Sequence, residues 1–450
     1  MFFLKGFERS VIGEKFKSKN ARPILYLMGA NLITLPIILF SNVIVARYLG
    51  VTEYGDYTFL VSLLALFTTI FTLGFYQAGG RAIVLSYSKK RVKQFYGAEL
   101  LLTFFLTSVL SVFLALYFYF DENIKQKGLE DYLGILIFFG WTFFLRRYFD
   151  VLFQSDKKIK LLALSKFLQP LFFLFFIIFI SFFDSQGEKL LVAALDSQGE
   201  KLLVAVLDLM ENKLLVAVLG LFFSNVISSL FIVFKLKVSF KSALKRVKEI
   251  WLYNKSFGLH LYIGGVFPLA FASMAGVMIS YTGNDNSGVG FYALAYSLSS
   301  VIALIPNVVA TVHYKDFSKQ KRIPVDIIFK TVLLSLTVLL LLLLLISPFV
   351  RFAYGESFLN VVDLVFIMAF GFFARGMGDF LNKYLGANGY GKLLRNGAIL
   401  TGLVLFCSSV VMIPIFKEYG AAVSSLLGSL TYLGVMVFFY RKVAIKKLRN

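Results

Sequence analysis

The sequence predicts an all-α integral membrane protein with 12 transmembrane helices in two pseudo-symmetric six-helix bundles. Composition is the first reason: 58% of the 450 residues are hydrophobic and only 16% are charged, against roughly 25% charged in ordinary globular chains. The mean hydropathy of +0.79 agrees. The other reasons are apolar runs that recur along the chain and short motifs shared by its halves. This composition excludes a soluble enzyme.

The apolar runs are each long enough to cross about 30 Å of hydrocarbon. They are too long and too continuously apolar to be strands of a membrane barrel, so helices are expected. The expected spans are 24–48, 56–80, 95–120, 132–153, 161–183, 214–234, 256–281, 290–312, 326–350, 360–382, 396–416 and 421–440.

The basic residues predict the orientation of these spans. Of the 46 Lys and Arg, 33 lie in the N-terminal segment, the C-terminal tail and alternate connections, and only seven in the opposite connections. Lys and Arg near helix ends are retained on the cytoplasmic side, so both termini are expected to be cytoplasmic. The net charge of +21 then reflects topology, with membrane lipid headgroups as its partner rather than nucleic acid.

Two motif pairs divide the chain into halves. Arg146 and Asp150 follow two phenylalanines in the fourth span, and Arg375 and Asp379 do the same in the tenth. The second pair consists of Gly55, Tyr57, Ser62 and Leu63, which match Gly290, Tyr292, Ser297 and Leu298. Six spans per half predict parallel repeats related by an axis along the membrane normal. The expected segments are a cytoplasmic N-terminal segment 1–23, a bundle 24–234, a basic cytoplasmic linker 235–255, a second bundle 256–440 and a cytoplasmic tail 441–450.

A tandem repeat interrupts the first bundle at 184–219, with copies of 12 residues each. Twelve residues advance a helix by three and a third turns, so the Glu-Lys pairs of successive copies share no face. The repeat is interpreted as a duplication at the outer entrance of the sixth span, which it is expected to extend as a helix.

Basic side chains inside spans need a physical reason, since each costs roughly 2.5–3.5 kcal/mol at the bilayer centre. Arg146 and Arg375 occupy equivalent places, and each either pairs with the aspartate four residues later or faces a wet cavity. Arg147 points about 100° away from Arg146. Arg47 ends the first span, where it either guards an outer mouth or anchors at headgroups. Guanidinium groups bind phosphate through paired donors, so these four arginines predict an anionic substrate.

The spans contain four acidic residues, Glu99, Asp150, Asp363 and Asp379. Of these, Glu99, Asp150 and Asp379 are candidates for ion coupling or charge pairing. The lone Cys407 permits no intrachain disulfide. The two histidines have no Cys or carboxylate at metal-ligand spacing, and no catalytic constellation is found. We therefore expect no metal, no cofactor and no catalytic site.

Short motifs resemble a known family. Ala46–Gly50, Glu53–Tyr57, Leu73–Arg81 and Tyr384–Gly389 resemble the Wzx-type O-antigen and polysaccharide flippases of the multidrug/oligosaccharidyl-lipid/polysaccharide (MOP) exporter superfamily. The resemblance implies a MATE-like fold in the bacterial inner membrane, and alternating-access transfer of an undecaprenyl-diphosphate-linked oligosaccharide from the cytoplasmic to the periplasmic leaflet. The glycan would be an O-antigen unit of lipopolysaccharide, a capsule unit or a relative. It also implies a cavity lined by basic side chains, carried over to Arg47, Arg146, Arg147 and Arg375, with a polysaccharide polymerase and a chain-length regulator as partners.

Two alternatives stay open at this point. An ion-coupled multidrug antiporter of the same superfamily is disfavoured because such proteins tend to carry an acidic residue in the first helix, and 24–48 has none. A membrane glycan polymerase or ligase is disfavoured because the outer connections are short apart from the repeat.

Overall fold

The computed structural model describes residues 22–194 and 212–449, which are almost entirely helical and contain no strand. Eight of their helices are long and apolar enough to cross a membrane. The all-α membrane fold expected from the sequence is thereby confirmed. The count of twelve spans stays a prediction, because α3 and α18 are each two helical segments merged across a bend, and α7 and α12 fall outside the eight.

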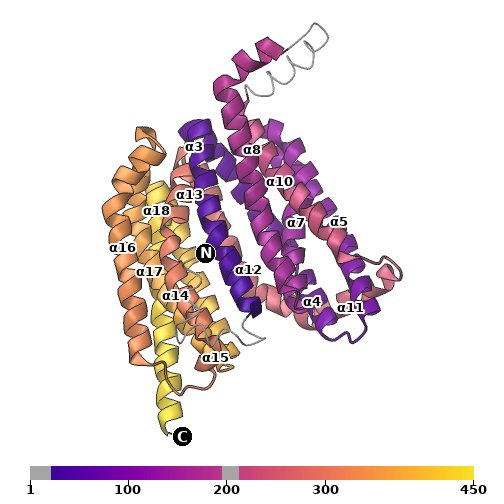
Figure 1. Ribbon diagram of the computed structural model, residues 1–450, viewed down its shortest axis with the longest axis vertical. Coiled ribbons are helices and arrows are strands. Elements are labelled where there is room, and N and C mark those ends of the chain that lie inside the picture. Colours follow the sequence, from indigo (N-terminus) through magenta and orange to yellow (C-terminus); the bar gives the residue numbers. More distant parts are fainter. Residues whose placement is uncertain (1–21, 195–211, 450) are drawn as a thin grey trace.

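Two lobes lie side by side (Figure 1). The first is built from α3 (Arg22–Phe71), α4 (Phe75–Val84), α5 (Lys89–Phe120), α6 (Glu122–Gln126), a 3₁₀ turn (Glu130–Tyr132), α7 (Leu133–Ser155), α8 (Ile159–Ala194) and α10 (Lys213–Leu236). A linker with α11 (Ala243–Tyr253) and a π-helical turn (Asn254–Gly258) leads to the second lobe. That lobe is built from α12 (Leu259–Thr282), α13 (Ser287–Ser299), α14 (Val301–Val312), α15 (Tyr314–Phe317), α16 (Val325–Ala353), a 3₁₀ turn (Glu356–Phe358), α17 (Asn360–Ala387) and α18 (Gly391–Arg449).

Backbone geometry ends the second expected span earlier than the apolar pattern suggested. The pattern predicted a span to residue 80, whereas α3 stops at Phe71 because Leu73 and Gly74 take left-handed φ angles of 46° and 80°. A helix cannot pass through that region. The short helix α4 that follows does not continue the span, and it becomes a separate element between the first lobe and the linker.

The tandem repeat falls partly on described residues. Its first copy is part of α8, which continues the fifth span as far as Ala194. The end of its third copy forms the first turns of α10, which begins at Lys213 after an Asn212 cap. The repeat thus lengthens the helix of the fifth span, where the sequence predicted an extension of the sixth. The second copy lies outside the described residues.

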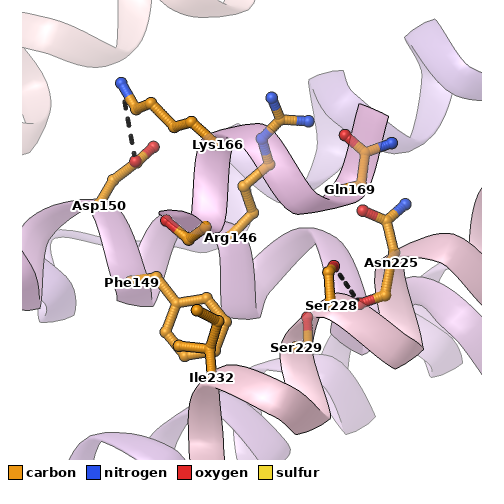
Figure 2. Close-up of a pocket in the computed structure, with 10 residues that line it drawn as sticks. Arg146, Phe149, Asp150, Lys166, Gln169, Asn225, Ser228, Ser229 and Ile232 are labelled. Atoms are coloured by element: carbon orange, nitrogen blue, oxygen red, sulfur yellow. Dashed lines mark hydrogen bonds and ion pairs between the residues drawn. The ribbon is translucent and has the colours of Figure 1, made fainter. Parts of the chain in front are cut away.

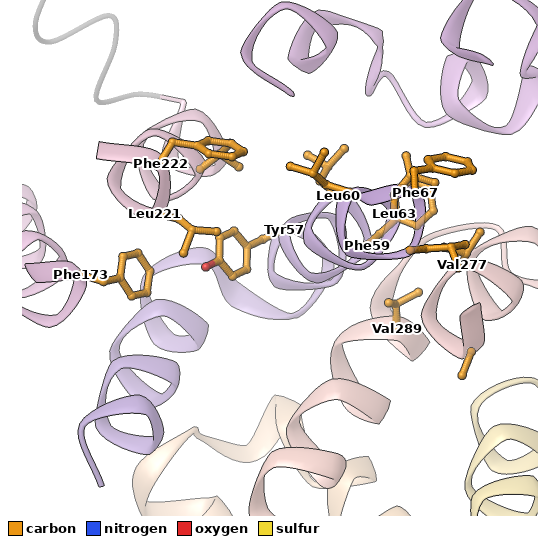
Figure 3. Close-up of a cluster of buried hydrophobic side chains, with 14 of the residues drawn as sticks. Tyr57, Phe59, Leu60, Leu63, Phe67, Phe173, Leu221, Phe222, Val277 and Val289 are labelled. Atoms are coloured by element: carbon orange, nitrogen blue, oxygen red, sulfur yellow. The ribbon is translucent and has the colours of Figure 1, made fainter. Parts of the chain in front are cut away.

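The two lobes meet where the second half of α3 packs on α12 and α13. Figure 3 shows Phe59, Leu63 and Phe67 of α3 beside Val277 of α12 and Val289 of α13. All five side chains are at most 9% exposed. This apolar contact holds the lobes together and leaves the polar residues of each lobe to be satisfied elsewhere.

The elements α4, α11 and α15 lie at one end of the molecule, the lower end in Figure 1. They carry connections that are rich in Lys and Arg, so the basic residues predict that this is the cytoplasmic end. The opposite end, which holds α6 and the connection between α12 and α13, is called the outer end below.

Candidate functional site

The two Arg-x-x-x-Asp motifs lie on α7 and α17, in equivalent positions of the two lobes. Large buried residues hold both helices in place: Phe144 and Tyr148 on α7 and Phe380 on α17 are each at most 1% exposed. Arg146 and Arg375 themselves are exposed, since the helix turns them away from these packed faces. The side chain of each arginine lines a pocket whose other lining residues include polar ones. Such a polar lining is not expected of a surface that faces lipid.

The pocket of the first lobe lies between α7, α8 and α10 (Figure 2). In that view Arg146 projects between Lys166 on one side and Gln169 and Asn225 on the other. The Nζ of Lys166 lies 4.0 Å from a carboxylate oxygen of Asp150. The cavity volume is about 20 Å³, which holds about one water molecule. In this conformation the pocket therefore offers little free space.

The pocket of the second lobe lies between α17 and the two halves of α18, which are the counterparts of α7, α8 and α10. It is larger, about 240 Å³. Its polar lining residues are Arg375, Asp379, Asn382, Thr401, Ser425, Ser429 and Tyr432. Asp379 accepts hydrogen bonds from the hydroxyl of Tyr432 at 3.0 Å and from the amide of Asn307 at 3.2 Å. Neutral donors thus hold this carboxylate.

The aspartates do not pair with the arginines that precede them. Among the described residues no ion pair joins Arg146 to Asp150 or Arg375 to Asp379. Asp150 lies beside Lys166 instead, and Asp379 is occupied by Tyr432 and Asn307. Of the two interpretations left open by the sequence, this geometry favours the one in which both guanidinium groups face a pocket.

Arg147 lies on another side of α7 and belongs to a third pocket. Its guanidinium donates to Thr69 Oγ1 at 3.2 Å, which fits the angular separation from Arg146 expected on a helix. The pocket has a volume of about 110 Å³ and is bounded by α3, α4, α7 and α12. Tyr262 of α12 closes one side, with its hydroxyl donating to the carbonyl of Ile70. Asp150 lines both this pocket and that of Arg146.

Arg47 lines none of these three pockets. Its guanidinium donates to the carbonyl of Phe352 at the end of α16, so it joins the first lobe to the second at the outer end. Of the two roles expected from the sequence, a position at the outer mouth fits this contact better than a free headgroup anchor. The structure does not gather the four predicted arginines into one cavity, since Arg146, Arg147 and Arg375 line three different pockets and Arg47 lines none of these.

Sequence reasoning missed a polar network at the same outer end, here called the outer latch: Asp56, Lys127, Ser280 and Asn286. Lys127 Nζ donates to Ser280 Oγ at 3.0 Å, to Asn286 Oδ1 at 3.1 Å and to the carbonyl of Ser280. The amide of Asn286 donates to Asp56 at 2.7 Å. Burial lowers the pKa of Lys127, while the nearby Asp56 and Asp285 act in the opposite direction. The latch closes the outer end between the lobes.

Lys383 was also missed. Its Nζ donates to the carbonyl of Asn307 at 3.0 Å and to the hydroxyl of Thr311, which fastens α17 to α14 below the second pocket. In the sequence Lys383 was counted with a cytoplasmic connection. Its spacing of four residues from Asp379 and eight from Arg375 places it on the same helix face, and that spacing was the available signal.

Glu99 lies in none of these pockets. It is 2% exposed on α5, and neither carboxylate oxygen has a hydrogen-bond partner within the described part of the chain. No group of His, Cys, Asp and Glu suited to a metal ion is found among the described residues.

Comparison with known proteins identifies the family of this chain and structures with a similar fold. A family model described as polysaccharide biosynthesis protein matches residues 21–321. Among solved structures, the lipid II flippase MurJ in an inward closed conformation superposes with a TM-score of 0.67 at 13% identity, covering 94% of this chain and 91% of that one. An inward-facing multidrug resistance MATE family transporter of the MOP superfamily gives 0.64 at 12% identity, covering 92% and 96%. No curated protein matches significantly.

Proposed function

Because the chain belongs to the polysaccharide biosynthesis protein family, we propose that it is a flippase for an undecaprenyl-diphosphate-linked oligosaccharide. The glycolipid would pass from the cytoplasmic to the outer leaflet of a bacterial inner membrane by alternating access. O-antigen, capsule or related units are the proposed glycans, with a polysaccharide polymerase and a chain-length regulator as partners. The observation that carries the proposal is the pair of equivalent pockets, each with an arginine that forms no ion pair within the described part of the chain.

The chemistry of the headgroup fits these pockets. A diphosphate presents several anionic oxygens, and guanidinium binds such oxygens through two parallel N–H donors while keeping its charge on desolvation. The aspartates do not compete for Arg146 and Arg375, because Lys166 and the hydroxyl of Tyr432 already contact them. Polar side chains around each arginine offer further donors and acceptors to phosphate and sugar.

The lobe arrangement supports alternating access. Both the latch and the Arg47 contact join the lobes at the outer end, so that end is closed in this conformation. Transfer to the outer leaflet requires these contacts to break while the lobes rock against each other. The prenyl tail would stay in the bilayer throughout, and only the charged headgroup and glycan would use the pockets.

The test compares Arg146→Ala, Arg375→Ala and the double variant with Lys330→Ala in a strain lacking the native gene. Lys330 is a matched control, because it is a basic residue of a spanning helix that lies at the membrane edge with its side chain 77% exposed, 3.6 Å from Asp326. Loss of a charge-assisted contact costs about 1.5–3 kcal/mol, so each pocket variant should reduce transport roughly 10- to 100-fold.

The readouts are surface polysaccharide and lipid-linked single units, both measured at equal protein levels. Accumulation of the units with loss of surface polysaccharide supports the proposal. Unchanged surface polysaccharide in the double variant refutes the roles of both arginines. Altered drug resistance with intact surface glycan would instead favour a multidrug antiporter.

A further inference from the structure

The buried carboxyl of Glu99 has an unusual environment that the proposed transport pockets do not explain. It lies where α5 packs against α4, and a Cβ added to Gly79 of α4 would come within 1.2 Å of its Oε1. The carboxyl therefore fills the space that Gly79 leaves. With 2% exposure and no hydrogen-bond partner for either oxygen among the described residues, it is shielded from water and makes no hydrogen bond there.

The titratable groups around Glu99 offer it no charge compensation. Tyr76 of α4 and Tyr148 of α7 face it, and Tyr96 lies on its own helix. Tyr76 is already bonded to Thr103 Oγ1 at 3.1 Å, and Tyr148 donates to the Tyr96 carbonyl at 3.3 Å. An ionised carboxylate without a partner costs several kcal/mol in such surroundings. The neutral, protonated acid is the form that this packing accommodates.

The lysine that contacts Tyr96, a residue of the helix that carries Glu99, is already occupied. Lys158 donates to the hydroxyl of Tyr96 at 2.8 Å and lies 2.9 Å from Asp156. A divalent metal ion is also a poor match, since Ca²⁺ and Mg²⁺ favour sites with more than one carboxylate or several other oxygen ligands, and no group of three or more His, Cys, Asp and Glu that could hold a metal ion is found in the described chain. A proton needs only the one carboxyl.

The helix α4 connects Glu99 to the part of the chain that joins the lobes. Phe75 of α4 packs on Trp251 of the linker, with ring centroids 5.5 Å apart, and Arg81 lies 4.4 Å from the ring centroid of Phe257. Asn254 donates to the carbonyl of Leu73 just before α4, at 3.0 Å. Movement of the linker therefore displaces α4, and with it the glycine that covers the carboxyl.

We propose that Glu99 is a proton-binding site that loads and unloads as the lobes move. The carboxyl is protonated while α4 covers it. When the linker draws α4 away, the carboxyl reaches the pocket of about 110 Å³ that Tyr76 and Gln77 line, and its proton passes to water there. The inference rests on the proposed function only in assuming that the lobes move against each other.

The test uses the purified full chain in lipid nanodiscs, without any glycolipid. Infrared spectroscopy measures the C=O stretch of a protonated carboxylic acid, and distances between spin labels on the two lobes measure the conformational equilibrium against pH. The variants are Glu99→Gln, an isosteric mimic of the protonated form, and Asp363→Asn, a control that removes an exposed acid of another span.

The wild type and Asp363→Asn should show the protonated band and a pH-dependent equilibrium, which changes by at most tenfold per pH unit for one proton. Glu99→Gln should lose the band, and in the Lys127→Met background, where the latch lysine cannot titrate, it should also lose the pH response. A response that persists in the Glu99→Gln, Lys127→Met double variant, or a band that Glu99→Gln does not remove, overturns the proposal.

Gly79→Ala provides a second variant that leaves Glu99 in place. Its added methyl takes the position of the carboxyl, so the protonated band should fall and α4 should be displaced; an unchanged band contradicts the packing argument. Since no glycolipid is present, these results do not depend on the outcome of the arginine variants. A transport defect in Arg375→Ala tests the proposed cargo and not the proton site, whereas the infrared band tests the proton site and not the cargo.

Discussion

Removal of Lys127 should release the outer end. Lys127→Met keeps the length of the side chain and removes three hydrogen bonds, two to Ser280 and one to Asn286. A bond from a charged donor contributes about 1.5–3 kcal/mol, but burial of the ammonium already lowers the pKa of Lys127 and so offsets part of this gain. A net loss of about 2 kcal/mol is expected, which shifts the closed-to-open equilibrium roughly 30-fold.

Double electron–electron resonance can measure this shift. Spin labels at Glu130→Cys and Glu356→Cys report on the outer connections of the two lobes, after Cys407→Ser has removed the native thiol. Lys125→Ala is the matched control, because this lysine of α6 is exposed and contacts only the face of Tyr119 among the described residues. Lys127→Met should add a longer distance that Lys125→Ala lacks. An identical distance distribution in both variants would show that the latch does not hold the outer end.

Three further outcomes follow from the same geometry. Gly55→Ala should open the outer end in the same distance measurement, since its Cβ would lie 2.0 Å from the carbonyl oxygen of Asn286; an unchanged distance would mean that the neighbouring backbone yields. Raising the pH toward 10.5 should favour the closed form of the wild type, because burial lowers the pKa of Lys127, and Lys127→Met should lose this alkaline part of the response. Tyr432→Phe removes a donor to Asp379 and a hydroxyl of the second pocket, which should weaken binding of a lipid-linked oligosaccharide about 3- to 10-fold by calorimetry; equal affinity contradicts that role.

The membrane class and the repetition of motifs could be predicted from the sequence because both depend on patterns within single segments. Apolar length predicts helices that satisfy their own backbone, and spacing along one helix predicted that Arg146 and Arg147 face different ways. The partner of Asp150 could not be predicted in this way. Lys166 comes from α8, so its proximity depends on how two helices pack, and the sequence offers only the competing neighbour four residues away.

The isolation of Glu99 is a further property that sequence alone does not reveal. The sequence around an acidic residue in an apolar span does not show whether its side chain faces a cavity, a cation or a closed interior. Its state depends on α4, and α4 exists as a separate element only because Leu73 and Gly74 break the preceding helix. The same backbone break that ends the second span thus creates the cover of the buried acid.

The two pockets differ in charge as well as in volume, and this asymmetry bears on how a glycolipid headgroup would be held. In the first pocket two cations, Arg146 and Lys166, face one carboxylate, whereas in the second Arg375 faces one carboxylate in a space about 220 Å³ larger. Excess positive charge favours a diphosphate, and a roomier, nearly neutral pocket with hydroxyls and amides favours sugar. Equivalent helices therefore need not do equivalent work: the first lobe is the better candidate for the anionic end of the cargo, and the second for its glycan.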